Sequence, residues 1–376
     1  MRSITHFLAF ILCFSTVLLS CSKSTSTKNP IEQVLNSEHL SIKKVVENIN
    51  QHGLQILFTK VEKDKNDNVT FEDYNFQVDD TSYFYPASSV KFPVAILALE
   101  KLNDISVLNR NTPFKLPKDS IFTTFEKEIE KLFAVSDNEA YNRLFEFLGQ
   151  DDINKRLNSK SIIGRISHRL STDNADRLAT DSIYFYSNDT IINVLSPIQN
   201  STIQPVELKG IKKGKGYFKN ESLVNEPMDF SKKNYLPVTS LHECLKRLVY
   251  PELFSEKEQF KISEDDRQFI LKSMSQLPKE AGYDKEEYYD SYVKFLVFGD
   301  SKKDIPEHIK IYNKVGYAYG TLTDCAHIIN TKTNIEYFIT ATILVNSNEI
   351  FNDDTYEYES IGIPFLAELG RQLIQY

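Results

Sequence analysis

The sequence predicts an α+β fold, because segments that alternate like strands lie near both ends of the chain and helical segments lie between them. Residues 54–61 and 69–78 alternate near the N-terminus, and residues 309–319 and 336–345 do so near the C-terminus. From about residue 90 to 276, apolar residues recur mainly at helical spacing. We therefore expect an antiparallel sheet built from both termini, with helices packed on it and a helical domain inserted.

The first 20 residues have the pattern of an export signal. Arg2 precedes an apolar run over residues 7–19, which is too short to span a bilayer. The run ends in the sequence LLSC at positions 18–21, which resembles a bacterial lipoprotein box, in which the cysteine is acylated. The resemblance implies a lipid anchor at Cys21 on the bacterial cell envelope, facing the periplasm or the outside. The alternative is an ordinary secretory signal with an incidental cysteine.

Three parts of the chain follow from this pattern. Residues 1–20 form the signal, residues 21–30 a polar and flexible tether, and residues 31–376 the folded body. Removing the signal takes away Arg2 alone among the charges, so the net charge changes from −8 to −8 − 1 = −9. An acidic balance argues against nucleic acid as a partner.

The expected helices are segments whose apolar residues fall on one face. They cover residues 31–50, 90–102, 126–135, 139–148, 239–250, 264–276 and 361–375. The first ends before Gly53, and Gly149 closes the fourth. Of the strands, the first two are joined by a polar turn at residues 63–67, and the last two by a short connector at residues 323–330.

The segment from about 171 to 236 differs from its surroundings, because it is rich in Asn, Ser, Lys and Gly. Residues 182–186 have the pattern of a strand, so we expect an extended insertion with its own hairpin. A basic turn at residues 209–216 is either a solvated hairpin tip or a contact for an anionic polymer or substrate.

The cysteines indicate no disulfide framework. Cys13 leaves with the signal and Cys21 is the lipidation candidate, so Cys244 and Cys325 remain in the body. Two buried thiols are favoured over a single bridge, which an oxidising compartment would permit.

A candidate nucleophile lies at the start of the helix over residues 90–102. Ser88 follows Tyr-Pro-Ala, and Lys91 comes three residues later, on the same helix face. Other Ser-x-x-Lys pairs start at Ser20, Ser41 and Ser291, so context and not the pair itself selects Ser88. A serine hydroxyl needs a base within reach, and a lysine desolvated in a core can be neutral enough to serve. The Ser88 N–H at the helix start could be one oxyanion donor.

Two further short motifs follow in the chain. Ser136-Asp137-Asn138 lies between two expected helices, where it could face the nucleophile or simply cap a helix. Lys314-Val315-Gly316 lies on an expected strand and continues as Tyr317-Ala318-Tyr319-Gly320, with Asp324 soon after.

Together the three motifs resemble the Ser-x-x-Lys, Ser-Asp-Asn and Lys-Thr-Gly signature of the penicillin-recognising serine hydrolases, and of class A β-lactamases in particular. The resemblance covers roughly residues 31–376 without the 171–236 insertion. It implies the β-lactamase/transpeptidase-like fold and catalysis through an acyl-enzyme. Ser88, Lys91, Ser136, Asn138 and Lys314 would then be catalytic.

The resemblance also implies roles for individual groups around that centre. Ser136 would pass protons to the leaving nitrogen, Asn138 would hold substrate and lysine, and Asp137 would be structural. Val315, Gly316 and Tyr317 would contact the substrate, with Gly316 allowing its approach and the Tyr317 N–H as second oxyanion donor.

Departures from the signature count against rapid β-lactam hydrolysis. Val315 stands where the family's threonine would help to hold the β-lactam carboxylate, and the last strand carries no arginine, since Arg371 is on the final helix. Residues 166–177 contain no Glu-x-x-x-Asn, which positions the deacylating water in class A enzymes. Asp173 with Asn174, or Asp176, are the nearest substitutes.

The sequence leaves several functions open. A slow β-lactamase, a cell-wall peptide or ester hydrolase of DD-peptidase type, and a non-catalytic envelope binding protein all fit the motifs. A Ser/His/Asp hydrolase is disfavoured because there is no Gly-x-Ser-x-Gly, and the seven histidines include no metal-spaced pair. We expect no cofactor, a small-molecule, peptide or ester substrate, and the membrane as a partner through the anchor.

Overall fold

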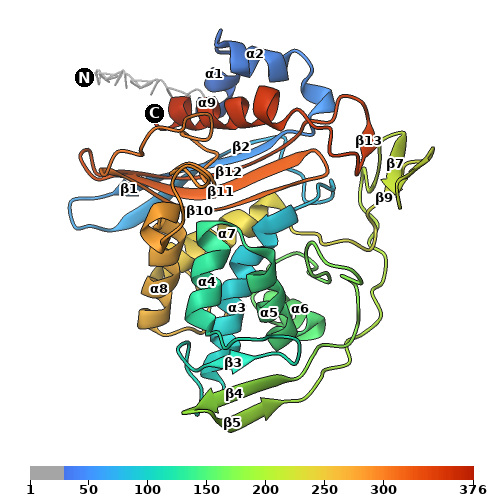
Figure 1. Ribbon diagram of the computed structural model, residues 1–376. Helices are drawn as coiled ribbons and strands as arrows, with labels where there is room; N and C mark the ends of the chain where they lie inside the picture. The colour runs from blue at the N-terminus through green and yellow to red at the C-terminus, as the bar shows by residue number, and fades with distance from the viewer. Residues whose placement is uncertain (1–28) are drawn as a thin grey trace, which may run out of the picture.

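The central sheet of the protein has five antiparallel strands in the order β10-β11-β12-β1-β2 (Figure 1). The computed structural model describes residues 29–376, so Cys21, the signal and most of the tether lie outside it. The strands are β1 (Gln55–Lys63), β2 (Val69–Phe76), β10 (Ile309–Ala318), β11 (Thr321–Asn330) and β12 (Ile335–Leu344). The prediction of an antiparallel sheet from both termini is confirmed, and β10 is an edge strand.

Two expectations about local structure are wrong. Residues 323–330 are not a connector but most of β11, a strand in the middle of the sheet. Its residues are buried on both faces, so the alternation that marks a half-buried strand is absent. Residues 31–50 form two short helices, α1 (Pro30–Leu35) and α2 (Leu40–Val46), and not one.

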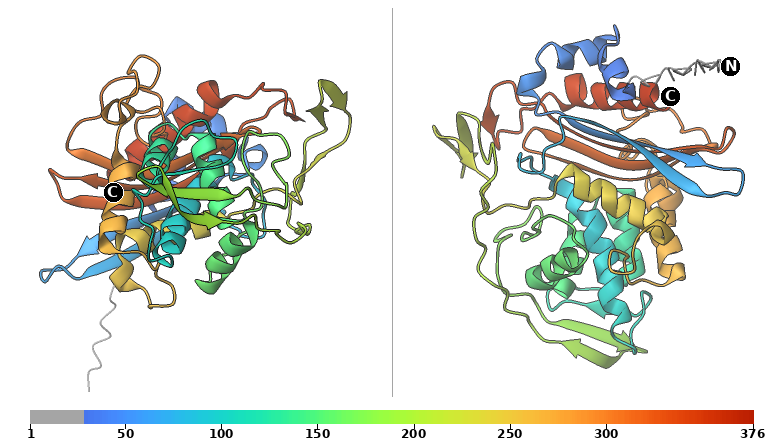
Figure 2. Two further views of the ribbon diagram at one scale, coloured as in Figure 1. Left: turned by 60° about the horizontal axis from the view of Figure 1, so that its bottom comes forward. Right: turned by 180° about the vertical axis from the view of Figure 1, so that it is seen from behind.

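Helices cover both faces of the sheet (Figures 1 and 2). On one face, α1 and α2 pack with the C-terminal helix α9 (Ile363–Leu373) over a core that includes Ile56, Val315 and Phe365. On the other face lies the helical block. Its helices are α3 (Lys91–Asn103), α4 (Phe125–Ala134), α5 (Asn138–Leu148), α6 (Gln150–Ser159), α7 (Val238–Val249) and α8 (Glu264–Ser275).

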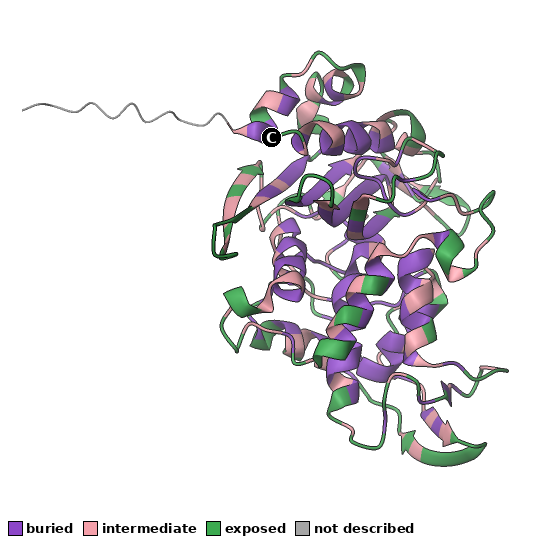
Figure 3. Cartoon of the chain, turned by 90° about the vertical axis from the view of Figure 1, so that its left-hand side faces the viewer, coloured by how far each residue is buried: buried purple, intermediate pink, exposed green. Residues whose placement is uncertain are grey.

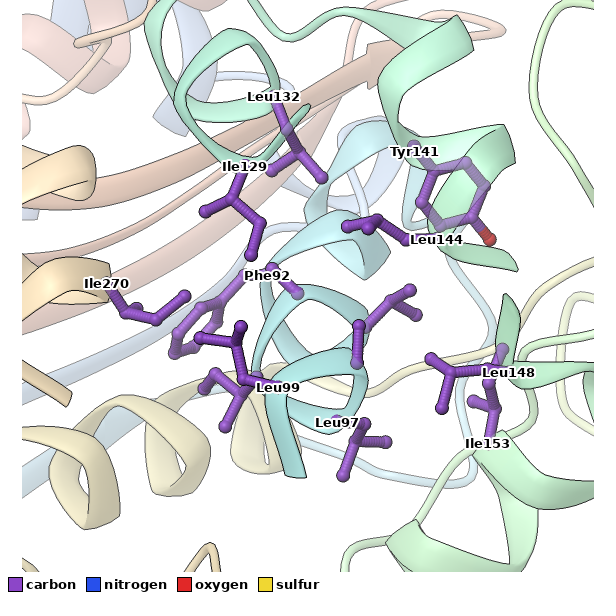
Figure 4. Close-up of a cluster of buried hydrophobic side chains, with 14 of the residues drawn as sticks. Phe92, Leu97, Leu99, Ile129, Leu132, Tyr141, Leu144, Leu148, Ile153 and Ile270 are labelled. Carbon is purple, nitrogen blue, oxygen red and sulfur yellow. The ribbon is translucent and has the colours of Figure 1, made fainter. Parts of the chain in front are cut away.

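The helix α3 runs through the centre of the helical block. Eleven of its 13 residues are buried, and Figure 4 shows Phe92, Leu97 and Leu99 pointing into the surrounding helices. Helix α5 contributes Tyr141, Leu144 and Leu148 to the same cluster and ends at Gly149 with φ +76°, as predicted. A rigid, fully packed α3 fixes the position of its N-terminus, where Ser88 and Lys91 lie.

The 171–236 segment contains short strands, and its predicted hairpin is confirmed. Strands β4 (Ile183–Ser187) and β5 (Thr190–Leu195) form that hairpin and pair with β3 (Phe114–Lys115) at the far end of the helical block. A second hairpin, β7 (Gly216–Lys219) and β8 (Ser222–Val224), adds to β13 (Ile350–Phe351). On either side of that second hairpin in the chain, β6 (Lys212–Lys213) pairs with β9 (Met228–Asp229). The hairpin tips are exposed, in contrast to the buried block (Figure 3).

The remaining cysteines are two free thiols, both fully buried, so the thiol alternative is confirmed. Cys325 on β11 donates to the carbonyl of Leu241 on α7, so the thiols join the sheet to the helical block. Across residues 29–376, no helix combines the length and apolarity needed to cross a membrane.

Candidate active site

Ser88 lies on a 3₁₀ turn, Ala87–Val90, that leads directly into α3. Strand β10 runs against this turn at Gly316, where an added Cβ would lie 2.4 Å from the carbonyl oxygen of Pro86 and 3.1 Å from Ser88 N. Only glycine permits this approach of two backbones. Gly316 was expected to make room for substrate; the structure shows that it makes room for the Ser88 turn.

Lys91 is fully buried on the first turn of α3. Its ammonium donates to Asn138 Oδ1 at 2.7 Å, to Ser136 Oγ at 3.3 Å, and to the carbonyl oxygen of Ser136. Burial lowers the pKa of Lys91 to about 7, against a smaller opposing effect of the Asp137 carboxylate. Within the described residues, Ser88 Oγ makes no hydrogen bond of its own, so its hydroxyl is free to reach either a substrate or the lysine.

The three side chains of the Ser-Asp-Asn segment make different contacts. Asp137 caps α5 by accepting from Ala140 N at 2.8 Å, as the capping interpretation predicted. Asn138 connects Lys91 to Ser171, whose Oγ accepts from Asn138 Nδ2 at 2.9 Å. Ser136 has a backbone φ of +58°, which a non-glycine residue adopts at an energetic cost. That conformation directs its hydroxyl toward the lysines.

Lys314 enters the site from β10 and is almost completely buried. Its ammonium donates to Ser136 Oγ at 2.8 Å and to the carbonyl oxygen of Val315 at 2.8 Å. Burial first, and the nearby positive charge of Lys91 second, hold the pKa of Lys314 well below its usual value. Both lysines therefore reach the Ser136 hydroxyl, and the positive charge of Lys91 disfavours a positive charge on Lys314.

A third buried lysine stands behind the site, and sequence reasoning passed over it. Lys294 donates to Asn313 Oδ1 at 2.7 Å, and Asn313 Nδ2 donates to Asp324 Oδ1 at 2.8 Å. Burial lowers the pKa of Lys294 to about 8 and raises the pKa of Asp324. Lys294 belongs to the Ser291-x-x-Lys pair, and its partners on β10 and β11 support the strand that carries Lys314.

The side chains of Val315 and Tyr317, which follow Lys314 on β10, lie in different surroundings. The Val315 side chain is fully buried on the opposite face of the sheet, packed in the core with α9, and does not line the cleft. Its expected role in contacting substrate through the side chain is therefore not supported. Tyr317 does line the cleft and is 49% exposed.

A cleft of about 730 Å³ opens above these groups. Ser88, Ser136 and Asn138 lie along it, together with Leu170 and Ser171 from the loop after α6. Of the described residues that line it, Asp137 and Asp354 are the carboxylates, and none is Lys or Arg. Asp137 is committed to its helix cap, and no glutamate is present to position water.

The substitutes considered for a deacylating base lie elsewhere. Asp173 and Asn174 line a separate hollow with Arg143 and Arg169, and Asp176 is exposed outside the cleft. Arg371 pairs with Asp300 at 2.8 Å and with Glu368, away from Ser88. Within residues 29–376 the structure thus joins Lys91, Ser136, Asn138 and Lys314 by hydrogen bonds beside Ser88, and neither a glutamate nor an arginine is among the residues that line the cleft.

Tyrosines dominate the outer walls of the cleft, a feature the motif search missed. Seven of the described tyrosines line it: Tyr85, Tyr288, Tyr292, Tyr317, Tyr319, Tyr356 and Tyr358. The signal was present in the chain as tyrosines spaced two apart in Tyr317-Ala318-Tyr319 and Tyr356-Glu357-Tyr358. Their rings contact one another, with Tyr317 to Tyr358 at 5.7 Å and Tyr356 to Tyr358 at 5.3 Å between centroids.

Comparison with known proteins identifies the fold. A sequence model described as "Beta-lactamase enzyme family" matches residues 41–198. A β-lactamase from Sphaerobacter thermophilus superposes with a TM-score of 0.51 at 12% identity, over 92% of this chain and 96% of the other. A PBP-A variant solved as an acyl-enzyme with penicillin G gives 0.52 at 12% identity, over 93% and 96%. PBP-A itself gives 0.51 at 13% identity, over 93% and 96%. No curated protein sequence matches the chain.

Proposed function

We propose that this protein is a serine hydrolase that forms an acyl-enzyme on Ser88. The premises are its β-lactamase/transpeptidase-like fold and its resemblance to the penicillin-recognising serine hydrolases. The observation that carries the proposal is the meeting of Lys91 and Lys314 at Ser136 Oγ, directly beside the Ser88 turn. Burying two lysines at one hydroxyl is costly, and such perturbed groups concentrate at catalytic sites.

In the proposed acylation step, Ser88 Oγ attacks the substrate carbonyl carbon and its proton passes to the neutral amine of Lys91. The lowered pKa of Lys91 supports this role, since a base with a pKa near the working pH is the most effective one. The N–H groups of Ser88 and Tyr317 would hold the developing oxyanion; the contact of Gly316 with the Ser88 turn brings these two backbones together.

Collapse of the tetrahedral intermediate breaks the bond to the leaving group, which needs a proton if it is an amine. Ser136 Oγ would donate that proton and regain one from a lysine ammonium, Lys314 at 2.8 Å or Lys91 at 3.3 Å. Asn138 would keep Lys91 in place and face the substrate from the cleft wall.

We infer that deacylation of β-lactams is slow, because the carboxylate that would activate water is missing from the cleft. Loss of one general-base step costs typically about 10²–10⁴-fold. The natural substrate is then a peptide or ester of the cell wall or its surroundings, in the manner of a DD-peptidase.

We further propose that the body is held at the bacterial envelope through Cys21, on the strength of the sequence at positions 18–21.

Intact-mass spectrometry tests the nucleophile. Wild-type protein and Ser88→Ala are incubated with a penicillin, a fluorophosphonate and a thioester panel. We expect a mass increase equal to the acyl or phosphonyl group on the wild type alone. Equal adducts on both proteins, or none on either with the whole panel, would leave a non-catalytic envelope binding protein as the better interpretation. Fatty-acid labelling that survives Cys21→Ala would contradict the anchor.

A further inference from the structure

A second, smaller pocket opens from the side of the cleft. It measures about 100 Å³, and Tyr292, Tyr317 and Tyr358 line both it and the cleft. Phe295 and Leu322 form its inner end, and Glu359 lies on its wall. Because the three tyrosines line both hollows, the pocket adjoins the cleft along which Ser88 lies.

Aromatic rings surround the pocket in edge-to-face contacts. The Tyr317 ring lies 5.7 Å from Tyr358 at 81° and 6.0 Å from Phe295 at 61°. Tyr292 completes the wall from the loop before β10. A pocket lined by several aromatic rings offers ring faces on which a cation can be held.

The charges around the pocket have one sign. Glu359 and Asp354 are exposed, and neither makes an ion pair in the part of the chain that the structure describes. No described Lys or Arg lines the pocket or the cleft. One basic side chain contacts a wall residue, since Lys302 Nζ lies 5.2 Å from the Tyr289 ring centroid. Lys302 itself is not among the residues that line the pocket.

We propose that this aromatic pocket binds a cationic group of the substrate, an ammonium or quaternary ammonium carried close to the scissile carbonyl. The proposal rests on the proposed function and names the substrate class for it: a cationic ester or amide, and not a carboxylate-bearing one. A carboxylate in the pocket would meet Glu359, and no described Lys or Arg is among the lining residues, which disfavours a carboxylate electrostatically.

Three thioesters with one acyl group and different thiol leaving groups test the charge preference. The leaving groups carry a trimethylammonium, the neutral tert-butyl isostere, or a carboxylate. We expect the second-order rate of thiol release to be roughly 2- to 30-fold higher for the cation than for the neutral isostere, and lowest for the carboxylate. Equal rates for cation and isostere, or a preference for the carboxylate, would overturn the proposal.

Two charge-removing variants test whether the preference for the cationic leaving group arises in the pocket. Glu359→Gln should reduce the preference for the cation over the isostere, measured as the ratio of the two rates in the same variant. Glu32→Gln removes the same charge from an exposed position on α1, across the sheet from the cleft, and should leave the preference unchanged. An equal loss of preference in both variants would show a general charge effect and no site.

Equilibrium binding separates this proposal from the nucleophile assignment. Tetramethylammonium is titrated into Ser88→Ala and into Ser88→Ala with Tyr358→Leu, with calorimetry as the readout. Binding to the first and at least severalfold weaker binding to the second supports the pocket even if no thioester acylates the wild type. No binding to Ser88→Ala, or equal binding to both, would contradict it even if Ser88 is acylated.

Discussion

Lys91 and Lys314 both direct their ammonium groups at Ser136 Oγ, at 3.3 and 2.8 Å, although they come from α3 and from an edge strand more than 200 residues later. Burial lowers the pKa of both lysines, and the positive charge of Lys91 lowers the pKa of Lys314 further. Above the pKa of Lys91 at least one amine is neutral and can accept a proton. Lys91 in its neutral form is therefore a proton acceptor within reach of the Ser136 hydroxyl, to which Lys314 also extends.

Acylation should rise with pH and level off above about 7. Lys91 must be neutral to accept the Ser88 proton, and burial lowers its pKa to about 7, so the active form is lost as pH falls below that value. Acylation rates with a penicillin measured from pH 5 to 9 give the inflection. Asp137 raises the pKa of Lys91, so Asp137→Asn should move the inflection to lower pH while still capping α5.

The matched control for that shift is Glu139→Gln on the same helix. Glu139 pairs with Lys118 at 3.7 Å and does not influence Lys91, so its inflection should stay at the wild-type pH. The same shift in both variants, or an inflection near 10, would show that Lys91 is not the titrating base.

Replacing Ser136 should separate stability from activity. At φ +58°, Ser136→Gly removes backbone strain and should be about 1 kcal/mol more stable than Ser136→Ala, while loss of the hydroxyl slows acylation by about 10²–10⁴-fold. Ser136→Ala loses the same hydroxyl but keeps the strain, so it should be as slow without the gain in stability. Thermal unfolding and acylation kinetics on both variants check this. A fully active Ser136→Ala would remove Ser136 from the proton path.

Gly316→Ala should disturb the site through the backbone. The new Cβ would lie 2.4 Å from the Pro86 carbonyl oxygen and 2.7 Å from Ser89 N, so β10 and the Ser88 turn must move apart. We expect destabilisation of about 1–3 kcal/mol and acylation about 10²-fold slower. Gly282→Ala, where φ is +86° but the added Cβ meets open space, should cost stability without slowing acylation. Unchanged acylation in Gly316→Ala would contradict the close approach.

The order of three motifs placed Lys91, Ser136, Asn138 and Lys314 in one site, and these four residues are joined by hydrogen bonds beside the Ser88 turn; their catalytic roles stay a prediction. The sequence could not predict contacts between segments that lie far apart in the chain, or burial that only the complete fold creates. Strand β11 was missed because burial on both faces removes its alternation.

The walls of the site were harder to predict than its centre. Neighbouring residues on a strand face opposite sides, so Val315 packs in the core with α9 while Lys314 extends to Ser136 on the other face of the sheet. The tyrosine walls come from β10, the loop before it and residues 352–358, which only the fold brings together. From the sequence, Lys294 could not be distinguished from a surface lysine, because only the fold brings Asn313 and Asp324 beside it.

The missing deacylating carboxylate can be supplied at Ser171. Its Oγ lines the cleft and accepts from Asn138 Nδ2 at 2.9 Å, and its φ of +49° is one that Asp and Asn tolerate. Wild-type protein should show a burst with nitrocefin and little steady-state turnover. Ser171→Asp places a carboxylate next to Asn138 and should raise the deacylation rate by at least tenfold, a modest share of what a general base can contribute.

Ser171→Asn is the control for that experiment, because it has the size and backbone tolerance of Asp but cannot act as a base. It should retain the burst and the slow steady state. Stopped-flow nitrocefin kinetics measure both phases, and the acyl-enzyme lifetime follows from mass spectrometry after the burst. Rapid steady-state turnover in the wild type would mean that a base outside the cleft lining reaches the acyl-enzyme. Equal acceleration by Asp and Asn would attribute the effect to a change in shape and not to proton abstraction.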